Sequence, residues 1–277
     1  MPEIPFIKPV LQKIDFPSFS KYGVQLEILR LDQMHKDLGG NKWFKLKRNI
    51  KKLKELNNPK VLSFGGAYSN HLRALSAVGN IFSFKTIGLV RGEIIRPLNP
   101  VLTFAESNGM ELYGLSRDEY RLKDSKKFLL SLRNTFGDFF LLPEGGGNQA
   151  ALLGCKEIAC HINPQPEGRF RYISLACGTG VTLAGITLGS STFQRTQILG
   201  VSVLNAPGYL SKEVKSYIRD YRNGVLDCQF SPWKILDQYH CGGYAKTNRD
   251  LLDFCNTFIK VTGVPIEPVY TGKMLYG

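Results

Sequence analysis

Residues 172–185 read YISLACGTGVTLAG, and this stretch decides the fold. An apolar run precedes Gly178 and Gly180, and a second apolar run follows them. The order predicts a buried strand, a tight glycine turn and the start of a helix, where backbone N–H groups and threonine hydroxyls converge on one anion. A plain tight turn without a ligand is the alternative interpretation.

The glycine spacing limits the kind of anion that this loop can bind. The pattern is G-x-G-x4-G rather than the dinucleotide pattern G-x-G-x-x-G, and the next predicted strand ends at Leu204-Asn205 without an acid. No Walker sequence is present, because Gly272-Lys273 is followed by Met274. The loop therefore favours a single phosphate.

Strand and helix patterns alternate over the rest of the chain. Repeated alternation implies parallel sheets with crossover helices, so we expect an α/β fold with a two-lobed, three-layer αβα architecture and mostly parallel sheets. Glycine clusters at 39–40, 65–66 and 145–147 are the expected crossing points between the lobes. The expected strands are 22–32, 60–64, 86–91, 110–113, 139–143, 171–176 and 198–203, and the expected helices are 41–57, 100–108, 148–161 and one that begins near Asn70.

The chain of 277 residues has 36 Lys and Arg against 23 Asp and Glu, a net charge of +13, and 43% hydrophobic residues. This apolar content suffices for a sizeable core and argues against disorder. Between Asn41 and Lys60, eight basic residues and one acid give a net +7. Apolar residues recur there at helical spacing, and the positions between them are lysines that we expect on a solvated face: Lys45, Lys47, Lys51, Lys52 and Lys54.

The basic segment allows three interpretations: a solvated helix face, attraction of an anionic ligand, or a nucleic-acid patch. No nucleic-acid-binding motif accompanies the charge, so we expect no nucleic-acid partner. Six cysteines and four histidines show no zinc-ligand spacing, so we expect no metal. The N-terminus lacks an apolar signal region, and the uncharged stretch 172–194 is too rich in Gly, Ser and Thr for a membrane span. We expect a soluble, cytoplasmic protein without a membrane partner.

Three other segments carry candidate chemistry. Lys42 follows Gly39-Gly40 at a helix start, where the helix dipole and nearby cations favour a neutral, nucleophilic amine; an ordinary surface lysine is the alternative. Ser69-Asn70 follows a strand and two glycines, where α/β sheets bind ligands, although either residue could serve only as a helix cap. Tyr244 and Tyr270 can transfer protons or pack in a core.

Together and in this order, these segments resemble the 1-aminocyclopropane-1-carboxylate deaminase / D-cysteine desulfhydrase family. The resemblance covers nearly the whole chain, and it implies pyridoxal phosphate as cofactor, the type II fold of the tryptophan synthase β subunit and a homodimer. A large cofactor-binding domain of residues 1–50 and 144–277 and a small α/β domain of residues 51–143 are expected.

The resemblance also implies roles for particular residues. Lys42 holds the cofactor covalently, Asn70 bonds its ring hydroxyl, and Ser69 faces the substrate α-carbon. Tyr244 and Tyr270 match the active-site tyrosines, and Lys42, Ser69, Tyr244 and Tyr270 form the expected catalytic set. The remaining expected cofactor contacts are Cys177, Gly178, Thr179, Gly180, Thr182 and Thr271.

One departure helps to choose the substrate. Deaminases of the family carry Glu where this chain has Thr271. A carboxylate there keeps the pyridine nitrogen protonated and strengthens the electron sink, whereas a hydroxyl leaves the nitrogen closer to neutral. The sequence therefore favours β-elimination from D-cysteine, giving pyruvate, sulfide and ammonia. The alternatives are cyclopropane ring opening to α-ketobutyrate and ammonia, and a catalytically silent cofactor-binding or nucleic-acid-associated protein.

Overall fold

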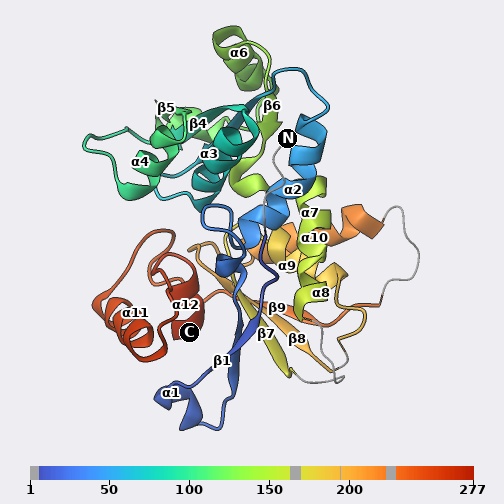
Figure 1. Cartoon of the computed structure of the whole chain (residues 1–277), viewed down its shortest axis with the longest axis vertical. Helices are drawn as coiled ribbons and strands as arrows, with labels where there is room; N and C mark the ends of the chain where they lie inside the picture. Colours follow the sequence, from blue (N-terminus) through green and yellow to red (C-terminus); the bar gives the residue numbers. More distant parts are fainter. Residues whose placement is uncertain (1–5, 163–169, 194, 223–228) are drawn as a thin grey trace. The chain divides into compact units, whose positions relative to one another are not determined.

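The computed structural model describes residues 6–162, 170–193, 195–222 and 229–277. They form two compact units, shown in Figure 1, and the chain passes between these units more than once. The first unit contains residues 6–7 and 32–151. The second contains residues 8–31 and the described part of 152–277.

The first unit is built on a four-stranded parallel sheet with the strand order β5-β4-β3-β6. Because all four strands run in one direction, the helices that follow β3 and β4 start from the same edge of the sheet. Its strands are β3 (Lys60–Gly65), β4 (Lys85–Arg91), β5 (Met110–Leu115) and β6 (Phe140–Leu142), and its helices are α2 (Asn41–Leu53), α3 (Asn70–Phe82), α4 (Pro100–Ser107), α5 (Arg117–Arg121) and α6 (Lys126–Phe136), with 3-10 turns at Leu31–Met34 and Glu144–Gly146.

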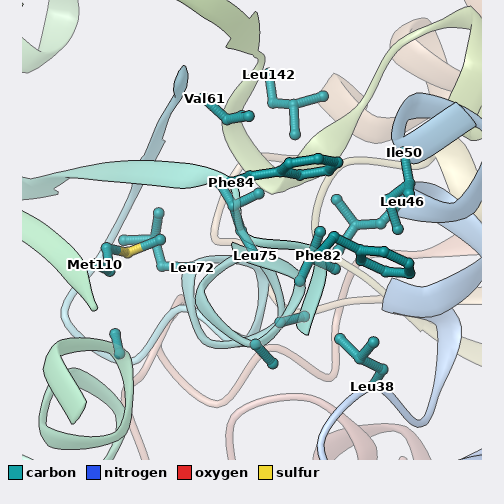
Figure 2. Packing of buried hydrophobic residues seen from close by; sticks show 14 of the residues in the cluster. Leu38, Leu46, Ile50, Val61, Leu72, Leu75, Phe82, Phe84, Met110 and Leu142 are labelled. Atoms are coloured by element: carbon teal, nitrogen blue, oxygen red, sulfur yellow. The ribbon is translucent and has the colours of Figure 1, made fainter. Parts of the chain in front are cut away.

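Both faces of this sheet are covered, which explains why its strands are nearly continuous apolar runs. Val61 of β3 packs into one core cluster, and its neighbour Leu62 packs into another. Figure 2 shows the first cluster, to which Leu46 and Ile50 of α2 and Leu75 of α3 all belong. The apolar side chains of α2 therefore pack in the core on one face of the four-stranded sheet.

Of the five lysines predicted on the solvated face, three follow the pattern, Lys47 is half-buried, and Lys45 departs from it. Lys51, Lys52 and Lys54 are exposed, as expected for a solvated face. Lys45 is buried, and its Nζ donates to the carbonyl oxygen of Gly145 at 3.0 Å. The expectation that Lys45 faces solvent was wrong, because this carbonyl satisfies the amine inside the unit.

The second unit contains a three-stranded parallel sheet with the order β7-β8-β9 and an antiparallel pair, β1 and β2. Helix α9 has no polar face, and all eight of its residues are buried. The strands are β1 (Leu11–Ile14), β2 (Leu26–Leu29), β7 (Tyr172–Cys177), β8 (Gln197–Ser202) and β9 (Trp233–Leu236), and the helices are α1 (Pro17–Ser20), α8 (Ile158–Ile162), α9 (Val181–Leu188), α10 (Tyr209–Arg222), α11 (Arg249–Thr262) and α12 (Thr271–Tyr276), while α7 (Gln149–Lys156) contains the boundary between the units.

The α/β class and the parallel sheets predicted from the sequence are confirmed. The strand expected over 22–32 is limited to β2, because only Leu26–Leu29 has a partner in β1. The helix expected over 148–161 is divided into α7 and α8. The compact units group residues 6–7, 32–50 and 144–151 with the first sheet, where α2 packs against α3, whereas the expected large domain contains them; the expected domain division stays a prediction. None of the described helices is both long and apolar enough to cross a bilayer.

Candidate active site

Lys42 is the second residue of α2, and the two glycines before it shape the turn that places it there. A Cβ at Gly39 would lie 2.5 Å from the carbonyl oxygen of Asp32, so that only glycine fits. Gly40 caps the helix with a φ of 80°, which also favours glycine. In the predicted turn, Gly39 therefore lies close to the backbone of Asp32, and Gly40 has a positive φ. Together they fix the start of the helix that carries Lys42.

Ser69 and Asn70 lie where β3 leads into α3. Ser69 is the N-cap of α3, and its Oγ accepts the backbone N–H of Leu72 at 3.3 Å. A Cβ at Gly65 would lie 2.6 Å from this oxygen, so the glycine makes room for the cap. Ser69 is buried, and Asn70 is the first residue of the helix. The capping interpretation of Ser69 is thus correct, and its expected role toward a substrate stays a prediction.

His71 is a buried residue beside this segment that sequence reasoning missed. Its Nε2 lies 2.9 Å from Ser63 Oγ, which in turn lies 2.8 Å from the carbonyl oxygen of Leu142. Because a hydroxyl has one proton to donate and the carbonyl can only accept it, we assign the Nε2–H tautomer to His71. Its Nδ1 has no hydrogen-bond partner among the described residues.

Burial and charge act on His71 in the same direction. Burial lowers the pKa of its imidazole well below 6.5, and the positive charges of Lys42 and Lys45 lower this pKa further. The effect of Lys42 shows that its amine lies within electrostatic reach of a buried neutral imidazole. In the first unit, Lys42 therefore lies at the start of α2 and Ser69 and Asn70 at the start of α3, and the positive charge of Lys42 acts on a buried imidazole that carries no charge near pH 7.

The second unit contains the predicted anion loop. β7 ends at Cys177, and Gly180 is the N-cap of α9 in the left-handed conformation, with a φ of 76°. A Cβ at Gly180 would lie 2.8 Å from Cγ2 of Val214. Among the described residues, no side chain caps this end of the helix. The loop thus presents the first backbone N–H groups of a buried helix, which is the arrangement that binds phosphate.

Two hydroxyl- or thiol-bearing residues of the loop face inward. Cys177 and Thr182 are both buried, and Thr182 Oγ1 lies 3.9 Å from the thiol of Cys155 on α7. Thr179, between the two loop glycines, is partly exposed. Cys177 is thus the buried last residue of β7, and its expected cofactor contact stays a prediction; the partly exposed part of the loop consists of Gly178 and Thr179.

Tyr270 and Tyr244 lie together in the second unit, next to this loop. A Cβ at Gly178 would lie 3.2 Å from Cε1 of Tyr270 and 3.8 Å from its hydroxyl oxygen. The rings of Tyr244 and Tyr270 are 5.9 Å apart at an interplanar angle of 71°, an edge-to-face pair. The structure therefore brings Tyr270 against the glycine loop, and Tyr244 packs on Tyr270.

Glu267 holds the segment that carries Tyr270 and Thr271, and sequence reasoning missed it as well. Its carboxylate accepts the backbone N–H groups of Val269, Tyr270 and Thr271 at 2.7 to 3.1 Å. Its own backbone N–H donates to the Thr271 hydroxyl at 3.1 Å. Burial raises the pKa of the Glu267 carboxyl, and these hydrogen bonds oppose the rise. The spacing of an acid three residues before Tyr270 was the signal that could have indicated this cap.

Residues 11–277 match the family described as pyridoxal-phosphate-dependent enzymes. The chain belongs to this family. Its cofactor is pyridoxal phosphate, as the sequence predicted. Taken separately, each unit has a group that fits this cofactor: the loop at 177–182 of the second unit has backbone donors suited to a phosphate, and Lys42 of the first unit has an amine that can react with an aldehyde.

Named relatives agree with this assignment. The chain is 27% identical over 272 residues to an Arabidopsis thaliana protein named bifunctional D-cysteine desulfhydrase/1-aminocyclopropane-1-carboxylate deaminase, mitochondrial, covering 92% of this chain and 67% of that protein. It is 27% identical over 263 residues to a putative 1-aminocyclopropane-1-carboxylate deaminase of Thermotoga maritima, covering 93% of this chain and 84% of that protein.

Solved structures share the fold of this pyridoxal-phosphate enzyme. The crystal structure of a 1-aminocyclopropane-1-carboxylate deaminase homologue matches with a TM-score of 0.85 at 24% identity, over 99% of this chain and 84% of that one. A hydrogen sulfide-producing enzyme from Fusobacterium nucleatum matches with a TM-score of 0.68 at 12% identity, over 98% of this chain and 88% of that one. At these identities the likeness confirms the type II fold.

Proposed function

We propose that this enzyme is a lyase that eliminates sulfide from D-cysteine. The observation that carries the proposal is Thr271, a neutral residue directly after Tyr270. A hydroxyl at this place supports elimination, which needs less electron withdrawal than opening a cyclopropane ring does. The overall reaction consumes one water and gives pyruvate, sulfide and ammonia.

We assign binding roles to residues of each unit, taken separately. The backbone N–H groups of the loop with Gly178, Thr179 and Gly180, together with Thr182, hold the cofactor phosphate. Asn70 would bind the ring hydroxyl of the cofactor, and Thr271 would act on its ring nitrogen. The phosphate contacts are supported by the uncapped start of α9 and by the left-handed Gly180. The positive charge of α2 adds attraction for an anionic cofactor and a carboxylate-bearing substrate.

Proton transfer falls to the amine of Lys42. When bound, the cofactor supplies an electron sink for negative charge at the substrate α-carbon. The Nζ of Lys42 removes the α-proton, the electron pair of that C–H bond forms the new double bond, and the C–S bond breaks with release of sulfide. Ser69 binds the substrate near its α-carbon. Tyr244 and Tyr270 orient the substrate beside the loop, and either hydroxyl can protonate the leaving sulfur.

The second candidate is deamination of 1-aminocyclopropane-1-carboxylate, which the names of the Arabidopsis and Thermotoga relatives favour. The α-carbon of this substrate has no proton, so Lys42 could not begin the reaction as a base there. A nucleophile or a proton must instead reach the ring. Thr271 in place of a carboxylate makes this route slower in the proposed assignment.

A substrate panel tests the choice between the candidates. Purified enzyme loaded with pyridoxal phosphate should release sulfide and pyruvate from D-cysteine faster than α-ketobutyrate from the cyclopropane substrate. Faster turnover of the cyclopropane substrate would contradict the proposal. L-Cysteine in the same panel reports the stereochemical preference.

The role of Lys42 has its own test. Lys42→Ala should lose both turnover and the visible absorbance band of the bound cofactor. Lys51→Ala serves as the matched control, because Lys51 is an exposed lysine of the same helix. If the band is missing from the wild type, the protein is catalytically silent; if it survives Lys42→Ala, another amine holds the cofactor.

We further infer a cytoplasmic homodimer that takes a small amino acid and no nucleic acid. Sedimentation can test the homodimer, and a nucleic-acid binding assay can test the absence of a nucleic-acid partner.

A further inference from the structure

Lys273 is a fully buried lysine in the middle of α12, with 0% of its surface exposed. Its Nζ donates to the carbonyl oxygen of Gly243 at 2.7 Å. An amine buried in this way is costly unless it is hydrogen-bonded, and an apolar side chain would fill the same space without the cost. The contact with Gly243 is therefore the feature that distinguishes this residue from an ordinary core position.

The two ends of this hydrogen bond belong to the two segments that carry the tyrosines. Gly243 directly precedes Tyr244, and Lys273 lies three residues after Tyr270. The same carbonyl oxygen of Gly243 also accepts the backbone N–H of Lys246 at 3.2 Å. Lys273 thus connects the backbone beside one tyrosine to the helix that follows the other.

The segment around Tyr244 needs such a connection because its backbone is strained. Positive φ values occur at Cys241 (49°), Gly242 (91°), Gly243 (118°) and Ala245 (58°). Two of these residues have side chains, and non-glycine residues hold such conformations only where surrounding contacts impose them. The charge-assisted bond from Lys273 is a strong contact at the centre of this segment.

We propose that Lys273 is a positioning residue that holds Tyr244 edge-to-face against Tyr270 for the bound substrate. It acts through the Gly243 carbonyl and does not itself touch the substrate. The role rests on the proposed function, in which both tyrosines orient the substrate. It adds to that function a residue that sets the geometry of the pair from inside the second unit.

The first test follows the tyrosines directly in the full, cofactor-loaded chain. The protein is labelled with 3-fluorotyrosine, and the fluorine resonances of Tyr244 and Tyr270 are assigned by replacing each with Phe. Lys273→Met should shift or broaden the Tyr244 resonance. Lys260→Met is the matched control, an exposed lysine on α11, and should leave this resonance unchanged. An unchanged Tyr244 resonance in Lys273→Met would overturn the proposal.

The second test separates positioning from a general loss of stability. Lys273→Met should lower kcat for sulfide release by at least about tenfold, while the affinity for pyridoxal phosphate changes by less than about threefold. The double variant Lys273→Met/Tyr244→Phe should be no slower than the slower single variant, because both changes remove the same contribution. Fully additive losses would show that Lys273 does not act through Tyr244.

Two provisions keep the test decisive. If Lys273→Met does not fold, Lys273→Gln, which keeps a donor for Gly243, takes its place: it should keep the Tyr244 resonance and kcat near those of the wild type, and loss of either would overturn the proposal. If the wild type turns over neither substrate, the proposed function fails. The fluorine spectra still decide whether Lys273 positions Tyr244.

Discussion

The ring of Tyr270 lies directly against Gly178, the first glycine of the loop between β7 and α9. A Cβ at Gly178 would approach Cε1 of Tyr270 to 3.2 Å, which is closer than most side-chain contacts allow. The backbone of Gly178 has no positive φ, so its glycine is required by this approach rather than by its conformation. The backbone of the loop and the ring of Tyr270 therefore limit each other's position. A substitution at Gly178 should displace the Tyr270 ring.

Gly178→Ala should displace the ring of Tyr270 by a few tenths of an ångström and leave the fold intact. We expect kcat for sulfide release to fall by about tenfold, equal to ~1.4 kcal/mol in the barrier, with a small change in melting temperature. Steady-state kinetics and thermal unfolding measure the two effects. A normal kcat would show that the position of Tyr270 does not limit the reaction.

Gly180→Ala provides the comparison, because its added Cβ meets Val214 at 2.8 Å and its φ is 76°. This change strains the cap of α9 itself, so the affinity for pyridoxal phosphate should fall more than in Gly178→Ala. Fluorescence titration of the cofactor-free protein measures both affinities. Equal affinities in the two variants would contradict the assignment of this loop to the phosphate.

The buried imidazole of His71 predicts a dependence of stability on pH. Its pKa in the folded protein is lowered well below 6.5, mainly by burial, whereas in the unfolded chain it is near 6.5. Below this pH the unfolded state binds a proton that the folded state does not. The free energy of unfolding should therefore decrease on acidification, by up to about 1.4 kcal/mol per pH unit from this group.

Denaturant unfolding between neutral and mildly acidic pH checks the prediction. His71→Gln keeps a donor for Ser63 and removes the titrating group. This variant should lose His71's share of the slope, although it is expected to be less stable at neutral pH because the amide does not reproduce the ring packing. The same slope in the variant and the wild type would mean that His71 is not its source.

Helix α9 begins at the phosphate loop, and Gly185 lets it pack closely against α7. A Cβ there would lie 2.4 Å from Cβ of Cys155 and 2.8 Å from the carbonyl carbon of Cys155. In an exposed helix, Gly→Ala stabilises. Here Gly185→Ala should instead lower the free energy of unfolding by about 1–3 kcal/mol, because backbone atoms of α7 must move. Chemical denaturation of the full chain measures the sign, and a stabilised variant would contradict this packing.

The sequence could predict features whose cause is local. The glycine turns before Lys42 and after β7 were predictable, because each combines a strand or helix boundary with residues that tolerate close approach or a positive φ. The strand predicted over 22–32 was too long. Alternation of polar and apolar residues shows which residues can form a strand, but not how many of them find a partner strand. β1 offers four residues, so pairing stops at Leu29.

Features that depend on distant segments could not be predicted. Lys45 fits a solvated pattern on its own helix, and only the fold brings the carbonyl of Gly145 to its amine. The bond from Lys273 to Gly243 joins residues thirty positions apart. His71 and Ser63 meet because α3 packs back on β3, and nothing in their spacing indicates that contact.

Thr271→Glu tests the argument on which the choice of substrate depends. An ionised carboxylate at this position would stabilise the protonated form of the cofactor ring nitrogen, and it should lower the rate of sulfide release by about tenfold, or ~1.4 kcal/mol. Thr271 Oγ1 lies 3.4 Å from Oε1 of Glu267, so the introduced carboxylate meets a like charge. Its pKa should therefore be raised above the usual value of about 4.3, and the loss of activity should deepen as the pH rises through that raised pKa.

The Glu267→Gln background isolates this charge effect. Relative to Glu267→Gln alone, the double variant with Thr271→Glu should show its full loss at a lower pH, because the competing carboxylate is gone. Initial rates of sulfide release across the acidic range measure both profiles, with cofactor saturation confirmed by absorbance. Unchanged or higher elimination rates in Thr271→Glu would contradict the link between Thr271 and β-elimination. The second candidate, deamination of the cyclopropane substrate, would then regain equal standing, because the hydroxyl would no longer distinguish the two reactions.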